Sequence, residues 1–77
     1  GYKVGDKTSG VLALKQLLML ANTAGLIKQG MDNNPIYGEG TKKAVNLLLQ
    51  DWGYKQTGIA GNNFIKRLKS ELAKKIK

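Results

Sequence analysis

The sequence predicts an all-α domain: a compact three-helix bundle in which one turn-and-helix unit occurs twice. Apolar residues recur at steps of three and four in three separate stretches, as in amphipathic helices packed around one core. One sequence pattern also occurs twice: an Ile two positions before a Gly, followed by a segment whose apolar residues have helical spacing. The aligned residues of the two copies are Ile36, Gly38, Thr41 and Val45, then Ile59, Gly61, Phe64 and Leu68.

The first helix is expected from about Ser9 to Ala24, with Thr8 or Ser9 as its N-cap. Gly25 suits the left-handed position that ends a helix, and Leu26 is the apolar residue that folds back on the last turn. The apolar stripe of this helix consists of Val11, Leu14, Leu17, Leu18 and Ala21, widened by Leu12 and Leu20.

The longest loop is expected from Ile27 to Pro35, where Gly, Asp and Asn residues gather. A second helix is predicted from Gly38, and Gly53 followed by Tyr54 repeats the Gly-then-apolar ending of the first. One face of this helix carries Thr41, Ala44, Val45, Leu48 and Trp52.

Residues 56–61 form the second turn, and Asn62 or Asn63 is expected to cap a third helix with a Lys-rich end. Its apolar positions are Phe64, Ile65, Leu68, Leu72 and Ile76. Short connections are expected to hold the three helices around one core. The predicted core residues are Leu14, Leu17, Leu18, Tyr37, Val45, Leu48, Phe64 and Leu68.

A chain of 77 residues allows one small domain over 1–77, with a polar lead-in at 1–9 and a basic extension of the last helix at 69–77. The absence of Cys and His excludes disulfides, thiolate and imidazole metal ligands and the commonest general base, so no cofactor or metal is expected. No apolar stretch approaches the roughly 20 residues that span a bilayer, so we expect a soluble domain without a membrane partner. No dedicated surface apolar stripe is visible in the sequence, and we expect a monomer. The chain begins at Gly1 without a charged-then-apolar leader, as a processed chain or an excised domain does, and any export signal would lie outside it.

The net charge of +8 indicates an anionic partner: nucleic acid, an anionic lipid surface or an anionic cell wall. The alternative is that a basic surface keeps a small domain soluble. The basic residues gather on the third helix and near the start of the second, at Lys66, Arg67, Lys69, Lys74, Lys75 and Lys77, and at Lys42 and Lys43.

Four short motifs follow one another along the chain. They are Gly10-Val11 with Leu14, the segment Tyr37–Val45, Leu49-Gln50 with Gly53-Tyr54, and the segment Gly58–Gly61. In this order they resemble the peptidoglycan-binding domain, an accessory module of bacterial and phage cell-wall hydrolases. The most specific segment is Tyr37–Val45, which matches the family's aromatic-Gly-x-x-Thr-x-x-Ala-Val pattern. The chain departs from the family at Asn34-Pro35 and Thr57-Gly58, where Asp-Gly is usual, and at Phe64, where Thr is usual.

The resemblance implies a non-catalytic domain that binds bacterial cell-wall peptidoglycan and holds a linked hydrolase, an endolysin or an autolysin, on its substrate. It implies an extracellular location at the bacterial cell wall, with the linked catalytic domain as one partner and teichoic acid as a further candidate. The alternative functions are a small basic helical nucleic-acid-binding domain and a structural oligomerisation module. Against nucleic acid, Phe64, Ile65 and Leu68 commit much of the third helix to the core.

The candidate ligand-binding residues are aromatic residues and two groups of polar turn residues. Aromatic rings offer flat apolar area with a polar tip, which suits sugars and peptides, and amides suit N-acetyl groups and peptide carbonyls. The alternative roles are core packing for the rings and turn or cap duty for the polar residues. The candidates are Asp32, Asn33, Asn34, Tyr37, Trp52, Tyr54, Asn62 and Asn63.

Catalytic residues are not expected. The chain has five acidic residues, and Glu39 and Asp51 stand near opposite ends of one predicted helix. Asp32 and Glu39 are close enough in sequence to meet across the first turn, but Glu39 is explained as a partner of the helix dipole. A lysine base would need burial, which the polar composition does not favour.

Overall fold

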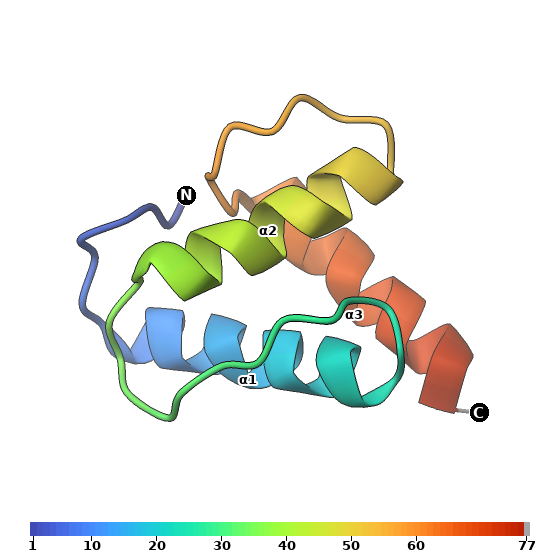
Figure 1. Ribbon diagram of the computed structural model, residues 1–77, viewed down its shortest axis with the longest axis horizontal. Coiled ribbons are helices and arrows are strands. Elements are labelled where there is room, and N and C mark those ends of the chain that lie inside the picture. The colour runs from blue at the N-terminus through green and yellow to red at the C-terminus, as the bar shows by residue number, and fades with distance from the viewer. Residues whose placement is uncertain (77) are drawn as a thin grey trace.

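The computed structural model describes residues 1–76, which form three helices: α1 (Ser9–Thr23), α2 (Glu39–Asp51) and α3 (Asn62–Ile76). Figure 1 shows their arrangement. The all-α, three-helix prediction is confirmed, with helix ends close to those expected. Lys77 and the side chain of Ile76, both named above, lie outside what the structure describes. Within residues 1–76 no helix has the length and apolarity to cross a membrane.

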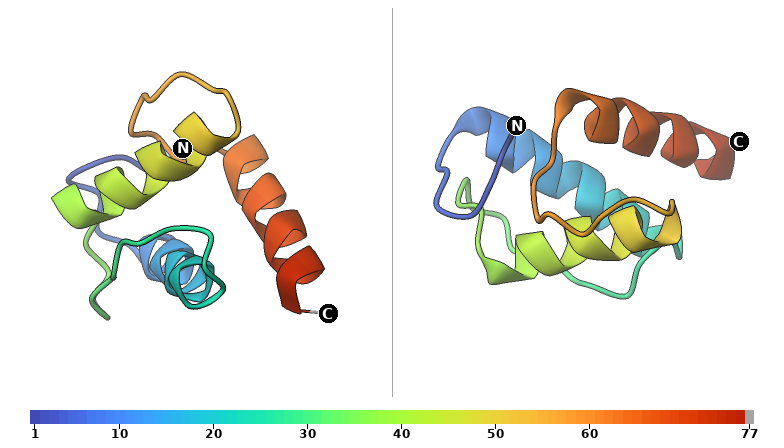
Figure 2. Two further views of the ribbon diagram at one scale, coloured as in Figure 1. Left: turned by 45° about the vertical axis from the view of Figure 1, so that its right-hand side comes forward. Right: turned by 90° about the horizontal axis from the view of Figure 1, so that it is seen from above.

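The three helices point in the same general direction, from left to right in Figure 1. In the view from above, α1 lies between α2 and α3, and both of these helices pack on it (Figure 2). Because the helices run in the same direction and not antiparallel, each connection must return along the length of a helix before the next helix starts. The expected short connections are therefore wrong: the chain uses residues 24–38 and 52–61 as return segments.

The core is built from the predicted stripes. Of the eight predicted core residues, seven are buried and Leu17 is half-buried against them. Leu20, expected to widen the stripe of α1, is exposed because its position on the helix faces away from α2 and α3. The buried positions of α1 are instead Val11, Leu14, Lys15, Leu18 and Ala21.

The two predicted helix endings are confirmed as equivalent motifs. Gly25 and Gly53 have φ of +82° and +79°, values that favour glycine. The N–H groups of Leu26 and Tyr54 then donate to the carbonyls of Ala21 (2.9 Å) and Leu49 (2.8 Å), which closes each helix with the same backbone bond.

The helix starts are also equivalent. Thr8 caps α1 by accepting from Val11 N at 3.2 Å. Gly38 and Gly61 directly precede α2 and α3, and each carbonyl accepts the N–H four residues later, both at 3.0 Å. Asn62 and Asn63, expected to cap α3, lie inside its first turn, because Gly61 occupies the position before the helix.

The lead-in is an integral part of the fold. It forms isolated antiparallel bridges with both turns, between Tyr2 and Ala60 and between Lys7 and Ile36. The ring of Tyr2 lies so close to Gly10 that a Cβ on Gly10 would collide with it. Residues 1–8 therefore connect the two turn-and-helix units, because they pair with the turn of each.

Candidate functional site

A hollow lies where the end of α2 meets α3. We call it the aromatic hollow. It has a volume of about 260 Å³ and is lined by Leu49, Tyr54, Asn63, Phe64 and Arg67. Leu49 and Phe64 are buried and form its apolar floor, whereas Tyr54 is 54% exposed. The helix ending at Gly53 positions Tyr54 beyond α2, on the side that faces α3.

Arg67 organises the aromatic side chains around this hollow. Its guanidinium lies 4.9 Å from the ring centre of Trp52 and 5.6 Å from that of Tyr54, and Nη1 donates to the Tyr54 hydroxyl at 3.1 Å. Trp52 is half-buried and packs on Phe64, with ring centroids 5.2 Å apart. The guanidinium thus holds the exposed Tyr54 ring in place and keeps further N–H donors at the rim.

Three predicted ligand-binding residues meet at this place. Tyr54 and Asn63 line the aromatic hollow, and Trp52 lies beneath Arg67. Asn62 is exposed on the same first turn of α3 but does not line the hollow. Arg67 was predicted only as part of a basic surface; its spacing from Phe64, one helical turn earlier, was the available signal.

The structure contradicts the prediction that Tyr37 binds a ligand. Its side chain is 1% exposed, so its ring cannot meet a ligand. Its hydroxyl donates to the carbonyl of Gly58 at 2.7 Å, and Gly58 N–H in turn donates to Asn46 Oδ1 at 2.7 Å. Burial, and secondarily the charge of Asp6, raises the pKa of Tyr37 to about 12. Tyr37 is therefore the residue that ties the first motif turn to the second.

A buried lysine engages the other predicted group. Lys15 is 2% exposed, which overturns the expectation that no lysine would be buried. Its ammonium forms an ion pair with Asp32 and donates to Asn34 Oδ1 at 3.0 Å and to the Ile36 carbonyl at 2.9 Å. All three N–H donors are used, so Lys15 holds the return segment against α1. The available signal was its place in the stripe, one turn after Val11 and one turn before Leu18.

The polar turn at Asp32, Asn33 and Asn34 lies elsewhere than the aromatic hollow. Asp32 lines a separate hollow of about 170 Å³, together with Lys15, Glu39 and the other first residues of α2. Asn33 is exposed, and Asn34 is held by Lys15 and by the Ile36 N–H. The structure therefore places three candidates at the aromatic hollow and three at this turn, whereas Tyr37 lies in the core and Asn62 lines neither hollow. Ligand contact by this turn stays a prediction.

The ion pair predicts a pH dependence. The hydrogen bond from Lys15 holds the pKa of Asp32 below its ordinary value of 3.8, although partial desolvation opposes the shift. The stabilisation is therefore present above 3.8 and is lost as the pH falls through the lower pKa of the folded state. The difference in free energy of unfolding between wild type and Asp32→Asn is expected to shrink below pH 4. Urea unfolding from pH 2 to 7 measures it; a constant difference, or the same pH effect in a Lys15→Met background, would contradict the pairing.

Within residues 1–76 the structure brings together no group of three or more Asp or Glu side chains that could hold a metal ion. Asp32 and Glu39 do line one hollow, as their sequence positions suggested. Asp32 is already paired with Lys15, so its carboxylate serves the ion pair first.

Comparison of the chain with protein-family models, curated proteins and solved structures finds no match. The resemblance to peptidoglycan-binding domains therefore depends on the motif residues alone. In the fold the residues of the most specific segment are structural: Tyr37, Thr41, Ala44 and Val45 are buried, and the Gly58 carbonyl accepts a hydrogen bond from the Tyr37 hydroxyl. This segment accounts for the fold, and exposed residues such as Tyr54, which belongs to a weaker motif, must account for any ligand.

Proposed function

We propose that this domain is a non-catalytic module that binds the peptidoglycan of the bacterial cell wall and retains a linked hydrolase there. The observation that carries the proposal is the aromatic hollow. Its exposed Tyr54 ring offers an apolar face with a polar rim, and the Asn63 amide and the Arg67 guanidinium flank it. A sugar ring needs an aromatic face for its C–H surface, and its hydroxyl and N-acetyl groups need amide and guanidinium partners.

The resemblance supports the same function, since the segment Tyr37–Val45 matches the most specific pattern of the family. Retention needs no catalytic group on this domain, because tethering raises the local concentration of the linked enzyme on its substrate. The bacterial cell wall is accordingly the proposed location, with the linked catalytic domain and wall teichoic acid as proposed partners.

Binding to purified sacculi tests the proposal with a matched pair of variants. Arg67→Gln and Lys69→Gln each remove one positive charge from α3, but only Arg67 lines the aromatic hollow. We expect Arg67→Gln and Tyr54→Ala to weaken co-sedimentation by about tenfold, which is about 1.4 kcal/mol, and Lys69→Gln by less than about twofold. Circular dichroism verifies that each variant is folded.

Equal losses for Arg67→Gln and Lys69→Gln would instead favour a binder of anionic polymers, such as a nucleic-acid-binding domain. The observation behind this second candidate is that the described lysines of α3, Lys66, Lys69, Lys74 and Lys75, are all exposed. A polyanion binder would bind duplex DNA and lose affinity steeply with salt, because each phosphate contact releases counterions. Wall binding that survives moderate salt and depends on Tyr54 excludes this candidate.

A further inference from the structure

A groove follows the solvent-facing side of α2. It consists of two hollows of about 610 and 260 Å³, both of which are lined by Leu47. Around Leu47 stand four carboxamide side chains, which define what we call the amide groove: Gln29, Asn46, Gln50 and Gln56. None of these residues lines the aromatic hollow, and of the four carboxamides Gln50 alone belongs to a motif that suggested the function.

The groove exists because the connections return along α2. Residues 25–29 come back from α1 on one side, and Gln56 stands in the return segment on the other. Between these walls α2 presents Lys43, Leu47 and Gln50, which the helical repeat places on one face. The opposite face carries the buried core residues Ala44, Val45 and Leu48.

The carboxamides keep hydrogen-bonding groups free. Within residues 1–76, the exposed side chains of Gln50 and Gln56 have no hydrogen-bond partner. Asn46 uses its oxygen for Gly58 N–H and retains its NH₂ group, whereas Gln29 uses its nitrogen for the Gly30 carbonyl at 3.2 Å and retains its oxygen. Donors and acceptors are thus both available, which is what an extended peptide backbone requires.

The centre of the groove is apolar. Leu47 is 41% exposed, although its neighbour Leu48 is 1% exposed. Leu47 therefore offers a contact for a small apolar side chain, such as that of alanine, between flanking amides.

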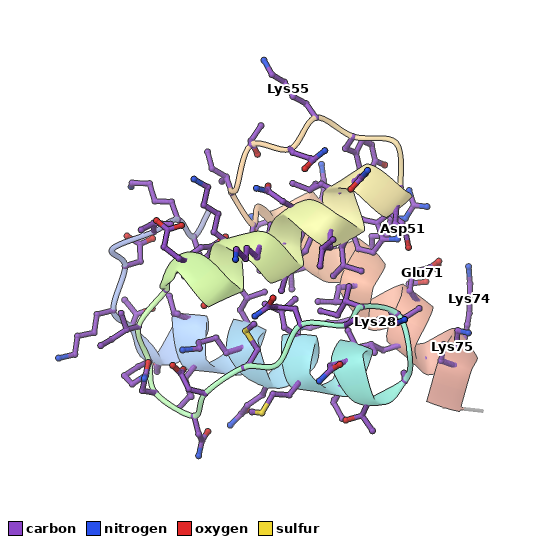
Figure 3. The ribbon with its side chains drawn as sticks, viewed as in Figure 1. Lys28, Asp51, Lys55, Glu71, Lys74 and Lys75 are labelled. Carbon is purple, nitrogen blue, oxygen red and sulfur yellow. The ribbon has the colours of Figure 1, made fainter. Side chains whose placement is uncertain are left out.

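Opposite charges flank one end of the groove. Lys28 stands in the wall formed by the return segment and Asp51 at the end of α2, and Figure 3 shows both side chains at that end of the molecule. Both are exposed, and no ion pair joins them among the described residues. This arrangement is complementary to a ligand with both a carboxylate and an ammonium group, since each would find one opposite charge.

We infer that the amide groove is a second binding site, and that its occupant is the peptide stem of peptidoglycan. The stem is a short peptide, rich in alanine, that carries free carboxylates and a free amine where it is not cross-linked. This inference rests on the proposed function, in which the glycan occupies the aromatic hollow. The two sites lie on different sides of α2, whose diameter with side chains is about 10 Å, and a five-residue stem extends about 17 Å.

The experiment uses the full chain and a soluble stem peptide, followed by NMR chemical-shift titration. We expect shifts at Leu47, Gln50 and Gln29. The double variant Leu47→Ala/Gln50→Ala is expected to weaken peptide binding by about tenfold. The matched control is Gln16→Ala/Leu20→Ala, which removes the same residue types from exposed positions of α1 and is expected to change binding by less than about twofold.

Sacculi and amidase-treated glycan strands without peptides separate the two proposals. If the stem peptide binds in the groove, the double variant binds sacculi more weakly than wild type does, but it binds peptide-free strands as well as wild type does. Absence of shifts with the free peptide, or equal losses for double variant and control, overturns the groove site. If sacculi are still bound through Tyr54 in that case, the proposed function stands; if wild type fails to bind sacculi, the proposed function falls whatever the peptide shows.

Discussion

Leu48→Ala is expected to lower the free energy of unfolding by about 2 to 5 kcal/mol. Leu48 is 1% exposed, on the face of α2 that meets the core, so truncation removes buried apolar contacts and leaves a cavity. For a domain this small such a loss is a large part of the total stability. Urea unfolding followed by circular dichroism measures it.

The adjacent residue provides the control. Leu47→Ala makes the same chemical change one position along α2, at a side chain that faces the amide groove. We expect a change within about 0.5 kcal/mol, as at other exposed sites. Equal costs for the two variants would show that α2 is rotated about its axis relative to this structure, and the amide groove would then not exist.

Tyr37→Phe is expected to cost about 1 to 3 kcal/mol, because it leaves the Gly58 carbonyl without the hydroxyl that donates to it. Alkaline titration adds a second measurement. The folded protein should show one tyrosine that ionises near pH 12, and this step should be missing in the variant. Since the pKa is raised from its ordinary 10.0, stability falls as the pH rises from 10.0 to about 12.

Tyr54→Phe is the matched control for this substitution. It removes the same hydroxyl from an exposed ring, where water replaces the bond from Arg67. Its expected effect on stability is within about 0.5 kcal/mol. A larger effect for Tyr54→Phe than for Tyr37→Phe would mean that the second turn is not anchored by Tyr37.

Tyr37 and Tyr54 also show why family likeness and ligand binding have to be tested separately in this chain. Tyr37 belongs to the most specific motif, yet it is buried and links the two turns. Tyr54 belongs to a weaker motif, yet it is the exposed ring of the aromatic hollow. Substitution of Tyr37 therefore reports on folding, whereas substitution of Tyr54 reports on binding.

The sequence by itself determined the local features of this protein. The three- and four-residue spacing of apolar side chains located each helix and its buried face, and the pairs Gly25-Leu26 and Gly53-Tyr54 located two helix ends. These features are predictable because they depend on residues within a turn or two of one another, through backbone hydrogen bonds and side-chain period.

The tertiary structure alone decided which polar residues would come together. Lys15 binds Asp32, Asn34 and the Ile36 carbonyl, all in the return segment. The periodicity of a helix carries no information about contacts between residues so far apart in the sequence. The sequence did not predict the common direction of the helices either, because the apolar stripe of a helix is the same whether its neighbour is parallel or antiparallel to it. That direction forces the connections back along α2 and thereby creates the amide groove, while the packing of α3 on α1 brings Arg67 to Trp52 and Tyr54.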